Sequence, residues 1–560
     1  MKKTVMTIIL AVLGITASAV ERVYVSTDKD VYVAGDIVWC SAFCIDSSTG
    51  RLSDASSVAY VELSSSRMTS ATCKIALIGG RGSGFLQIPF TTPTGNYSIL
   101  GFTYSGKERP DLEADAKVIS VFNTLSSERV DGNVSIVDTP AYDSLKPAGK
   151  KTSGGVAILA GRAADCNSES TLYLENKSGE AVSISLSVCL EDGILSPTGA
   201  SIVDFSGLSI NDYPSSQPES DGEVLRGRLV GSDAALVTDN INQLAFVAFP
   251  GYAQDVYAGK ISKEGRVQIP TGNIYGDRDM LTEILGLDNT KDCHLFIDSP
   301  FLNRRRPDIP ELLLSKAIAR DLAARNKAMH SVRSAEVDTL YEYLPKRHSL
   351  LLDDGLCIDY HLDDYTRFPT IRETLVEITP NLRLRKNIAG VVEMQVDLLD
   401  TKTDVSHFTG NMLVLIDGIP VNDIQSLLDF DPMLLSDILV YPYTYNIGGS
   451  PFFGVADFVT QKGDISSFHF DPNVQIVDWQ GVAYPVAYTC EKLAVGGEDF
   501  RNTLYWHPLI ELQPGETKKL AVRTPGYPGF FKVTAEGLSA SGMPVRSETG
   551  FEVRQGPEAL

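Results

Sequence analysis

The feature that most constrains the fold of this chain is a two-residue apolar alternation that turn residues interrupt at short intervals. It runs from Val20 to about Asn123, through stretches such as ERVYVST, SVAYVELSS and NYSILGF. Successive side chains of a β-strand point to opposite faces, so alternation broken by Asp, Gly and Pro predicts short antiparallel strands. The pattern returns after residue 127 and again after Leu225. We therefore expect a mainly β chain of tandem macroglobulin-like or Ig-like sandwiches.

Breaks in this pattern divide the chain into segments, and 560 residues agree with a prior of about 100 to 200 residues per domain. The expected segments are a signal peptide over 1–19, a first sandwich over 20–126, a second sandwich over 127–205, an exposed linker or long loop over 206–223, a third β-module over 224–302, a helical linker over 303–367, a small α+β domain over 368–466 and a C-terminal sandwich over 467–560.

The first residues have the order of a secretory signal. Lys2 and Lys3 precede an apolar core from Val5 to Ile15, and Ala17-Ser18-Ala19 supplies small residues for cleavage. No other uncharged run reaches the roughly 20 residues of a membrane span. We therefore expect an exported protein without a transmembrane segment, either periplasmic or associated with the outer membrane.

The charge of the chain limits its partners. The formal net charge is −22, and removing residues 1–19 would take away two lysines and no acidic residue. An acidic surface of this kind argues against binding to nucleic acid or to anionic lipid. The sequence also contains no H-E-x-x-H and no G-x-S-x-G pattern. We predict no catalytic residues, no metal ligands and no cofactor, so the expected function is not enzymatic, and the binding residues are unknown.

Cysteine and histidine clusters have structural explanations. Eight cysteines are scattered along the chain, and only Cys40 and Cys44 lie close together. Positions i and i+4 of a strand face the same side, so we expect these two to be buried small residues. His361, with Asp359, Asp363 and Asp364, could surround a cation, but we favour an exposed acidic loop. Arg304 to Arg306 could bind an anion, but we favour the solvated entrance of a helix that starts at Pro310.

The first stretch resembles a known module through the order of its residues, which are Thr27-Asp28-Lys29, Tyr32, Gly35-Asp36, Val38-Trp39, Tyr60-Val61-Glu62-Leu63, Phe85, Pro89 and Gly95-Asn96-Tyr97. This order is similar to the macroglobulin-type module of alpha-2-macroglobulin-like proteins and of many large exported Gram-negative proteins. We expect Gly35-Asp36 to form a hairpin turn and Trp39 to point into the core. Large macroglobulins trap proteases through a thioester in a Cys-Gly-Glu-Gln stretch, which this sequence lacks, so covalent trapping is not expected.

The segment 368–466 predicts a compact α+β unit. Thr370 can cap a short helix that Pro380 ends, Asp417-Gly418 can form a turn after a buried strand, and a short helix over Ile424 to Leu428 follows. This order resembles the plug domain of TonB-dependent outer-membrane receptors. Only about 95 residues follow Asp464, however, too few for a receptor barrel of many strands.

The last segment looks like the closing β-module of the same exported proteins, with Asp499 to Pro508 as a recurrent stretch. Strict alternation would place Leu504 and Trp506 on one face of a strand and Tyr505 on the other. We expect Arg501 to pair with Asp499 or to cap the end of the sheet.

These observations predict a non-enzymatic scaffold of the cell envelope that binds other envelope proteins. A second hypothesis is an accessory role in TonB-dependent transport, with a receptor barrel as the partner. A third hypothesis is protease inhibition without a thioester.

Overall fold

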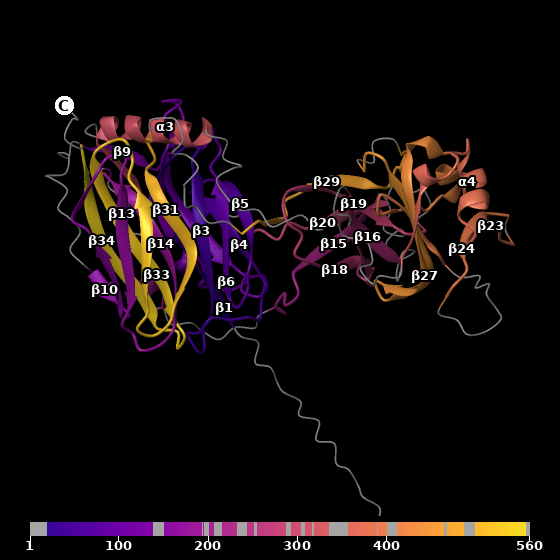
Figure 1. Cartoon of the computed structure of the whole chain (residues 1–560), viewed down its shortest axis with the longest axis horizontal. Coiled ribbons are helices and arrows are strands. Elements are labelled where there is room, and N and C mark those ends of the chain that lie inside the picture. Colours follow the sequence, from indigo (N-terminus) through magenta and orange to yellow (C-terminus); the bar gives the residue numbers. More distant parts are fainter. Residues whose placement is uncertain are drawn as a thin grey trace, which may run out of the picture. The chain divides into compact units, whose positions relative to one another are not determined.

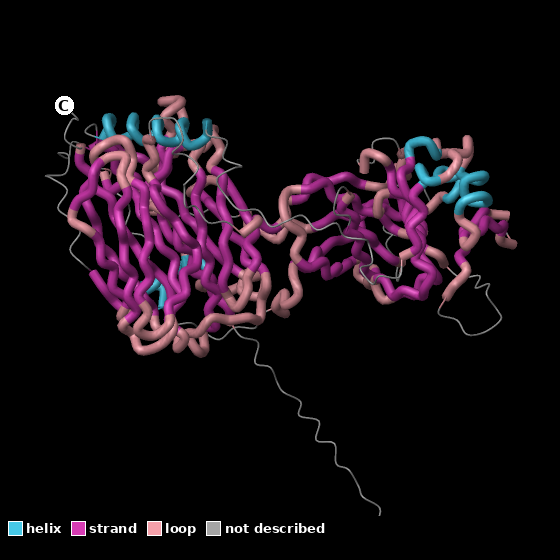
Figure 2. The backbone as a smooth tube through the Cα atoms, in the orientation of Figure 1, coloured by secondary structure: helices cyan, strands magenta, loops and turns pink. Residues whose placement is uncertain are grey.

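The computed structural model of this protein describes residues 20–137, 151–192, 194, 201–206, 216–231, 243–250, 255–286, 293–303, 308–315, 318–334, 357–388, 390–399, 411–463, 468–485 and 499–555. The predicted signal peptide, the arginine cluster and residues 207–215 of the predicted linker lie outside these residues. Two compact units divide the chain: the first unit takes Met1–Ser220, Phe301–Glu342 and Pro485–Leu560, and the second unit takes Asp221–Pro300 and Tyr343–Tyr484. Figure 2 shows that strands dominate the described chain, which confirms the mainly β fold class.

The first sandwich of the first unit consists of the predicted alternating strands. Its order is β5-β4-β7-β1-β3-β6, with β8 beside β7 and β2 beside β8. Cys40 and Cys44 are completely buried in its core, as predicted. Gly35 has a φ of +98°, and a Cβ atom there would lie 2.4 Å from the ring of Phe90, so the predicted turn requires glycine. The strands are β1 (Glu21–Thr27), β2 (Val31–Val33), β3 (Ile37–Asp46), β4 (Val58–Ser64), β5 (Thr69–Ala76), β6 (Arg81–Gln87), β7 (Gly95–Phe102) and β8 (Lys117–Phe122).

The second sandwich of the first unit combines strands from both ends of the chain. One sheet has the order β10-β34-β33-β14-β31, with β12 beside β34, and the other has the order β11-β13-β32. Figure 1 shows β14 between β31 and β33. The strands are β10 (Lys151–Ser153), β11 (Val156–Ala160), β12 (Ala163–Asp165), β13 (Glu169–Asn176), β14 (Val182–Glu191), β31 (Thr503–Leu512), β32 (Thr517–Arg523), β33 (Gly529–Ser539) and β34 (Pro544–Arg554).

This pairing differs from the predicted separation into a second sandwich over 127–205 and a C-terminal sandwich over 467–560. Val188 of β14 pairs with Tyr505 on one side and with Val533 on the other. Both segments also contribute to one apolar core, which includes Leu172, Leu186, Leu512, Val533 and Phe551. The two predicted modules are therefore one module, and the alternation within each segment does not reveal its distant partner.

The predicted helical linker begins later than the sequence indicates. Leu312–Ser315 forms the strand β21, which pairs in parallel with β9 (Val134–Val137), and the helix α3 spans Ala319–Ser334. Strand pairing therefore replaces the first part of the helix that was expected to start at Pro310. Within α3, Leu322 packs in the same apolar cluster as Ile318. The stretch 206–223, which was predicted to be an exposed linker or long loop, also differs from the prediction. Its Glu219 is buried and accepts a hydrogen bond from Tyr60 Oη at 2.8 Å.

The second unit contains a β-module and an α+β domain. The β-module has one sheet of order β18-β15-β20 and another of order β17-β16-β19-β29. Its last strand follows the α+β domain in the sequence, so the third β-module is also built from two separate segments. The strands are β15 (Glu223–Gly231), β16 (Leu244–Phe249), β17 (Asp255–Lys260), β18 (Arg266–Gly272), β19 (Arg278–Ile284), β20 (Cys293–Ile297) and β29 (Gln475–Trp479).

The α+β domain contains the predicted helices and strands, but it begins earlier than the predicted residue 368, because β22 comes from the stretch 303–367 that was expected to be a helical linker. Its sheet has the order β22-β27-β28-β25-β26, and a separate hairpin joins β23 to β24. Thr370 Oγ1 accepts a hydrogen bond from Glu373 N and so caps α4, as predicted. Asp417 and Gly418 both have positive φ and form the predicted turn. The elements are β22 (Ile358–His361), α4 (Ile371–Ile378), β23 (Leu382–Lys386), β24 (Val392–Val396), β25 (Leu413–Ile416), β26 (Ile419–Pro420), α5 (Ile424–Leu428), β27 (Leu435–Ile447) and β28 (Ser450–Thr460).

Candidate functional site

The two sandwiches of the first unit meet at the residues that carry the macroglobulin-type resemblance. Asp28 is buried, and its Oδ1 accepts hydrogen bonds from Tyr32 Oη at 2.7 Å and from Trp39 N at 3.2 Å. Its Oδ2 accepts a hydrogen bond from Thr503 Oγ1 of the second sandwich at 2.6 Å. A buried carboxylate is costly unless it is hydrogen-bonded. Asp28 therefore fixes the end of β1 and joins it to β31.

Two tryptophans stack across the same junction. The ring centroids of Trp39 and Trp506 lie 5.8 Å apart, at an interplanar angle of 29°. Trp39 is buried as predicted, but it packs against the second sandwich rather than inside the core of the first. Offset stacking of aromatic rings contributes about 0.5 to 1.5 kcal/mol beyond the area that it buries.

A β-bulge in β31 orients Trp506. Cys189 pairs with Thr503 and Val188 pairs with Tyr505, so Leu504 is an extra residue in the ladder. Leu504 and Tyr505 both lie in the core of the second sandwich, while Trp506 faces the first. The predicted sharing of one face by Leu504 and Trp506 is therefore wrong, because the bulge interrupts the alternation. The prediction for Arg501 is confirmed, since its Nε lies 2.8 Å from Asp499 Oδ1.

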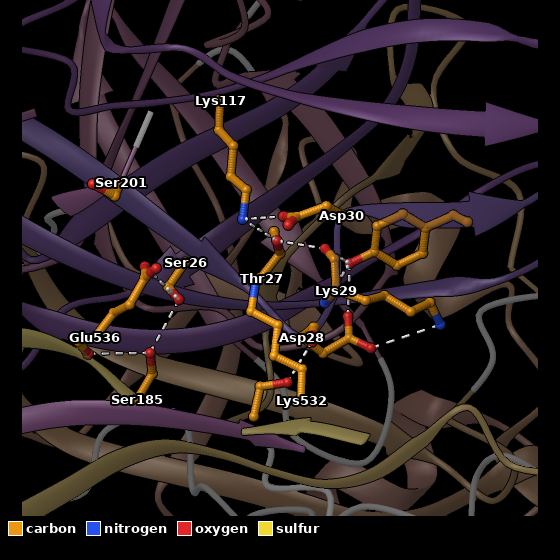
Figure 3. Close-up of polar contacts among 12 residues, drawn as sticks. Ser26, Thr27, Asp28, Lys29, Asp30, Lys117, Ser185, Ser201, Lys532 and Glu536 are labelled. Atoms are coloured by element: carbon orange, nitrogen blue, oxygen red, sulfur yellow. Dashed lines mark hydrogen bonds and ion pairs between the residues drawn. The ribbon is translucent and has the colours of Figure 1, made fainter. Parts of the chain in front are cut away.

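A cavity of about 250 Å³ lies beside this junction, between β1 and the strands β14, β33 and β34. Charged residues dominate its wall. The cations are Lys29, Lys117, Arg325, Lys532 and Arg546, and the carboxylates are Asp28, Asp30, Glu191, Asp192 and Glu536. Figure 3 shows Lys117, Asp30, Ser26, Ser185 and Glu536 among the polar residues of this region.

Ion pairs hold most of these charges. Lys117 Nζ lies 2.8 Å from Asp30 Oδ1 and donates a hydrogen bond to Thr27 Oγ1 at 2.7 Å (Figure 3). Burial alone would raise the pKa of Asp30, but the Lys117 ammonium, together with Lys532 and Arg546, outweighs burial and lowers it. Burial alone would lower the pKa of Lys117, but Asp30 and Glu536 raise it. Both residues therefore stay charged at neutral pH.

A second network connects the two sandwiches around Glu536. Tyr24 Oη of β1 donates a hydrogen bond to Glu536 Oε2 at 2.5 Å, and Arg546 forms an ion pair with Glu536. Burial, followed by the Glu536 carboxylate, raises the pKa of Tyr24 well above its ordinary value. Ser185 Oγ donates to Ser26 Oγ at 3.0 Å, as Figure 3 shows. The wall is thus a polar network with fixed charges, an arrangement that is suited to holding a small polar ligand.

The sequence did not single out the residues of this wall. Lys532, Thr534 and Glu536 alternate along β33 with the core residues Phe531 and Val533. Such alternation is typical of a strand with one solvated face. The structure instead places that polar face against β1, and only the pairing of distant segments decides this.

The predicted exposed loop around His361 is instead the end of strand β22, which includes Asp359 and His361, followed by a 3-10 turn that includes Asp363 and Asp364. His361 Nδ1 lies 2.6 Å from Asp437 Oδ1 of β27, and this hydrogen bond raises the pKa of His361. Asp363 forms an ion pair with Arg367. Among the described residues, no group of three or more His, Cys, Asp or Glu side chains is arranged to hold a metal ion. Nor does any described helix have the length and apolar character of a membrane span.

Comparisons with known proteins find only distant similarity to solved structures. No protein-family model and no curated protein matches the chain. Among solved structures, the chain is similar to Salmonella alpha-2-macroglobulin reacted with methylamine, with 8% identity, 96% of this chain and 40% of that chain covered, and a TM-score of 0.24. Native Escherichia coli alpha-2-macroglobulin gives 7% identity, the same coverage and a TM-score of 0.24. The E. coli adhesin FdeC gives 10% identity, covers 50% of this chain and 65% of that chain, and has a TM-score of 0.15.

The chain spans about 40% of the length of these two bacterial alpha-2-macroglobulins. Identities and TM-scores this low carry no argument about function. The likeness of the α+β domain to a receptor plug stays a prediction.

Proposed function

We propose that this protein is a non-enzymatic scaffold of the cell envelope that acts through contacts with other envelope proteins. The signal sequence supports export to the periplasm or the outer membrane. The observation that carries the proposal is a set of apolar side chains in solvent on the α+β domain. Val376 of α4 is 76% exposed, Ile388 at the β23–β24 turn is fully exposed, and Val391 and Leu399 are 58% and 62% exposed.

Single exposed apolar residues are common on protein surfaces. Here four exposed apolar side chains lie within 24 residues of sequence. Apolar surface in water is unfavourable, at about 25 cal/mol per Å², so a partner that covers these side chains would gain binding energy. Arg385 and Lys386 of β23 are exposed beside the same turn and could contact acidic groups of that partner. We therefore expect the hairpin β23–β24 to be the contact surface.

Photocrosslinking in intact cells tests this proposal. A photoreactive amino acid replaces Ile388 in the full chain, and the matched control replaces Glu264, an exposed residue of a turn in the same unit. We expect a discrete crosslinked envelope protein at position 388 that is absent at position 264. Identical products at both positions, or no product at position 388, would contradict the proposal.

An accessory role in TonB-dependent transport is the second candidate. The order of α4, the strands and α5 in the α+β domain supports it, because this order matches the plug-like prediction. Purification of the tagged full chain from mild detergent should then recover an outer-membrane barrel. Recovery of partners without any barrel would remove this candidate and leave the scaffold proposal intact.

A further inference from the structure

The wall of the cavity in the first unit has five cations and five carboxylates, and Glu191 is the carboxylate for which the described structure gives no ion pair. The five cations form ion pairs with the other four carboxylates of the wall and with Asp36 and Glu548, which lie outside the lining. The pairs are Lys29 with Asp28 and Asp36, Lys117 with Asp30, Arg325 with Asp192, Lys532 with Glu548, and Arg546 with Glu536 and Glu548. Each cation of the wall is therefore already paired, and Glu191 is left without an ion-pair partner among the described residues. A ligand that brings positive charge would supply one.

Glu191 is the acidic residue of the wall to which the described structure gives no partner. It is the last residue of β14, it lines the cavity, and its Oε2 is shielded from solvent with no hydrogen-bond donor. A buried polar atom without a partner costs about 1 to 3 kcal/mol, and more when it is charged. A donor from a ligand would remove this cost, which makes Glu191 the anchor of the site.

The size of the cavity limits the ligand. Drug-sized ligands occupy pockets of roughly 300 to 1,000 Å³, whereas this cavity has about 250 Å³. Hydroxyl groups of Thr27, Ser185 and Thr534 line the space between the charged residues. The wall therefore suits a short polar chain with an ammonium group rather than an aromatic or a lipid.

We propose that this cavity binds a small organic cation that carries a primary ammonium group, and that the Glu191 carboxylate accepts its hydrogen bond. An ammonium group presents three N–H donors, and one of them can form a charge-assisted hydrogen bond with the Glu191 carboxylate. This site is independent of the contact surface on the α+β domain.

The groups that face Glu191 also predict how binding depends on pH. Burial raises the pKa of Glu191, Lys532 of β33 opposes this rise, and Glu548 of β34 and the adjacent Asp192 add to it. A bound cation favours the ionised carboxylate, so affinity should fall as the pH decreases and Glu191 takes up a proton.

Isothermal titration calorimetry on the full chain tests the proposal with three five-carbon probes: cadaverine, which has two ammonium groups, glutarate, which has two carboxylates, and the neutral 1,5-pentanediol. We expect cadaverine alone to bind, and more tightly at pH 8 than at pH 5. In Glu191→Gln, the loss of a charge-assisted hydrogen bond should weaken cadaverine binding roughly tenfold or more. The control Glu552→Gln changes an exposed glutamate of β34 and should leave binding unchanged.

Glu191→Gln keeps the shape of the side chain and removes a carboxylate without a partner, so we expect it to fold, which its circular dichroism and melting temperature will check. If Glu191→Gln proves less stable than the wild type, Glu191→Asp provides a second comparison. Because it keeps a carboxylate, it should retain part of the cadaverine affinity and the pH dependence of binding. Absence of cadaverine binding to the wild-type chain, preferred binding of glutarate, or equal affinity in Glu191→Gln would overturn the proposal.

Discussion

At the residue scale, two buried carboxyl groups lie beside one turn of the α+β domain. Asp417 has a φ of +47°, and its carboxylate accepts hydrogen bonds from Thr460 N at 2.8 Å and from Thr460 Oγ1 at 2.6 Å. Asp457 Oδ1 accepts a hydrogen bond from Gly418 N at 3.0 Å, while its buried Oδ2 has no partner. Burial raises the pKa of Asp457 to about 7, and the nearby Asp417 carboxylate adds to this rise.

This pair makes stability depend on pH in a predictable direction. An unfolded aspartate has a pKa of about 3.9, so the folded state binds more protons than the unfolded state between that pH and about 7. The unfolding free energy should therefore fall as the pH rises through this window. Asp457→Asn cannot ionise, and its Oδ1 can still accept from Gly418 N. At pH 8 we expect it to be more stable than the wild type by roughly 2 to 4 kcal/mol.

Urea unfolding at pH 5 and pH 8, followed in the second unit, measures this effect. The control Asp478→Asn removes an exposed carboxylate of β29 and should leave the pH dependence as in the wild type. A destabilised Asp457→Asn at pH 8 would show that the ionised carboxylate is required by the fold.

At the element scale, the bulge in β31 decides how the two sandwiches meet. By adding Leu504 to the ladder, it lets Thr503 and Trp506 both face the first sandwich, although three positions separate them.

Trp506 is completely buried. Trp506→Ala should therefore cost roughly 3 to 5 kcal/mol in unfolding free energy. Trp506→Phe keeps an aromatic ring against Trp39 and should cost less, and chemical denaturation of both variants measures the difference. Equal losses would show that stacking contributes little at this junction.

A helix cap offers a second element-scale prediction. Thr370 begins α4 by accepting a hydrogen bond from Glu373 N at 3.2 Å. Thr370→Ala should destabilise the second unit by about 1 kcal/mol, because one N–H at the start of the helix loses its partner. Thr370→Ser retains the hydroxyl and should restore most of the loss in urea unfolding. If Thr370→Ser is as unstable as Thr370→Ala, then the methyl group of Thr370, rather than the hydrogen bond of its hydroxyl, contributes the stability.

At the scale of the whole molecule, the second sandwich depends on the last segment of the chain. β14 lies between β31 and β33, and both of these strands belong to residues after 484. A chain that ends at 484 would expose the apolar faces of β13 and β14 to water. We expect this truncated chain to aggregate, and a separate chain of residues 485–560 to restore a folded one-to-one complex when both are expressed together. Size-exclusion chromatography distinguishes the outcomes, and a monomeric, cooperatively folded truncated chain would contradict the prediction.

The sequence by itself determined the local features of this protein. The alternation predicts the strands of the first sandwich, the Gly35-Asp36 and Asp417-Gly418 pairs predict turns, and Thr370 predicts the start of α4. These features depend on neighbouring residues, whose backbone preferences and side-chain periodicity are written directly in the chain. The burial of Cys40 and Cys44 follows from the same periodicity.

Only the tertiary structure decided which distant segments join. The fusion of 151–191 with 503–554, the strand β21 in place of a helix turn and the cavity around Glu191 all depend on pairing across hundreds of residues. A polar strand face has the same alternation whether it meets water or another sandwich, so Lys532 and Glu536 carry no local sign of burial. Pairing between remote strands is set by the complementarity of whole surfaces, which no short stretch of sequence contains.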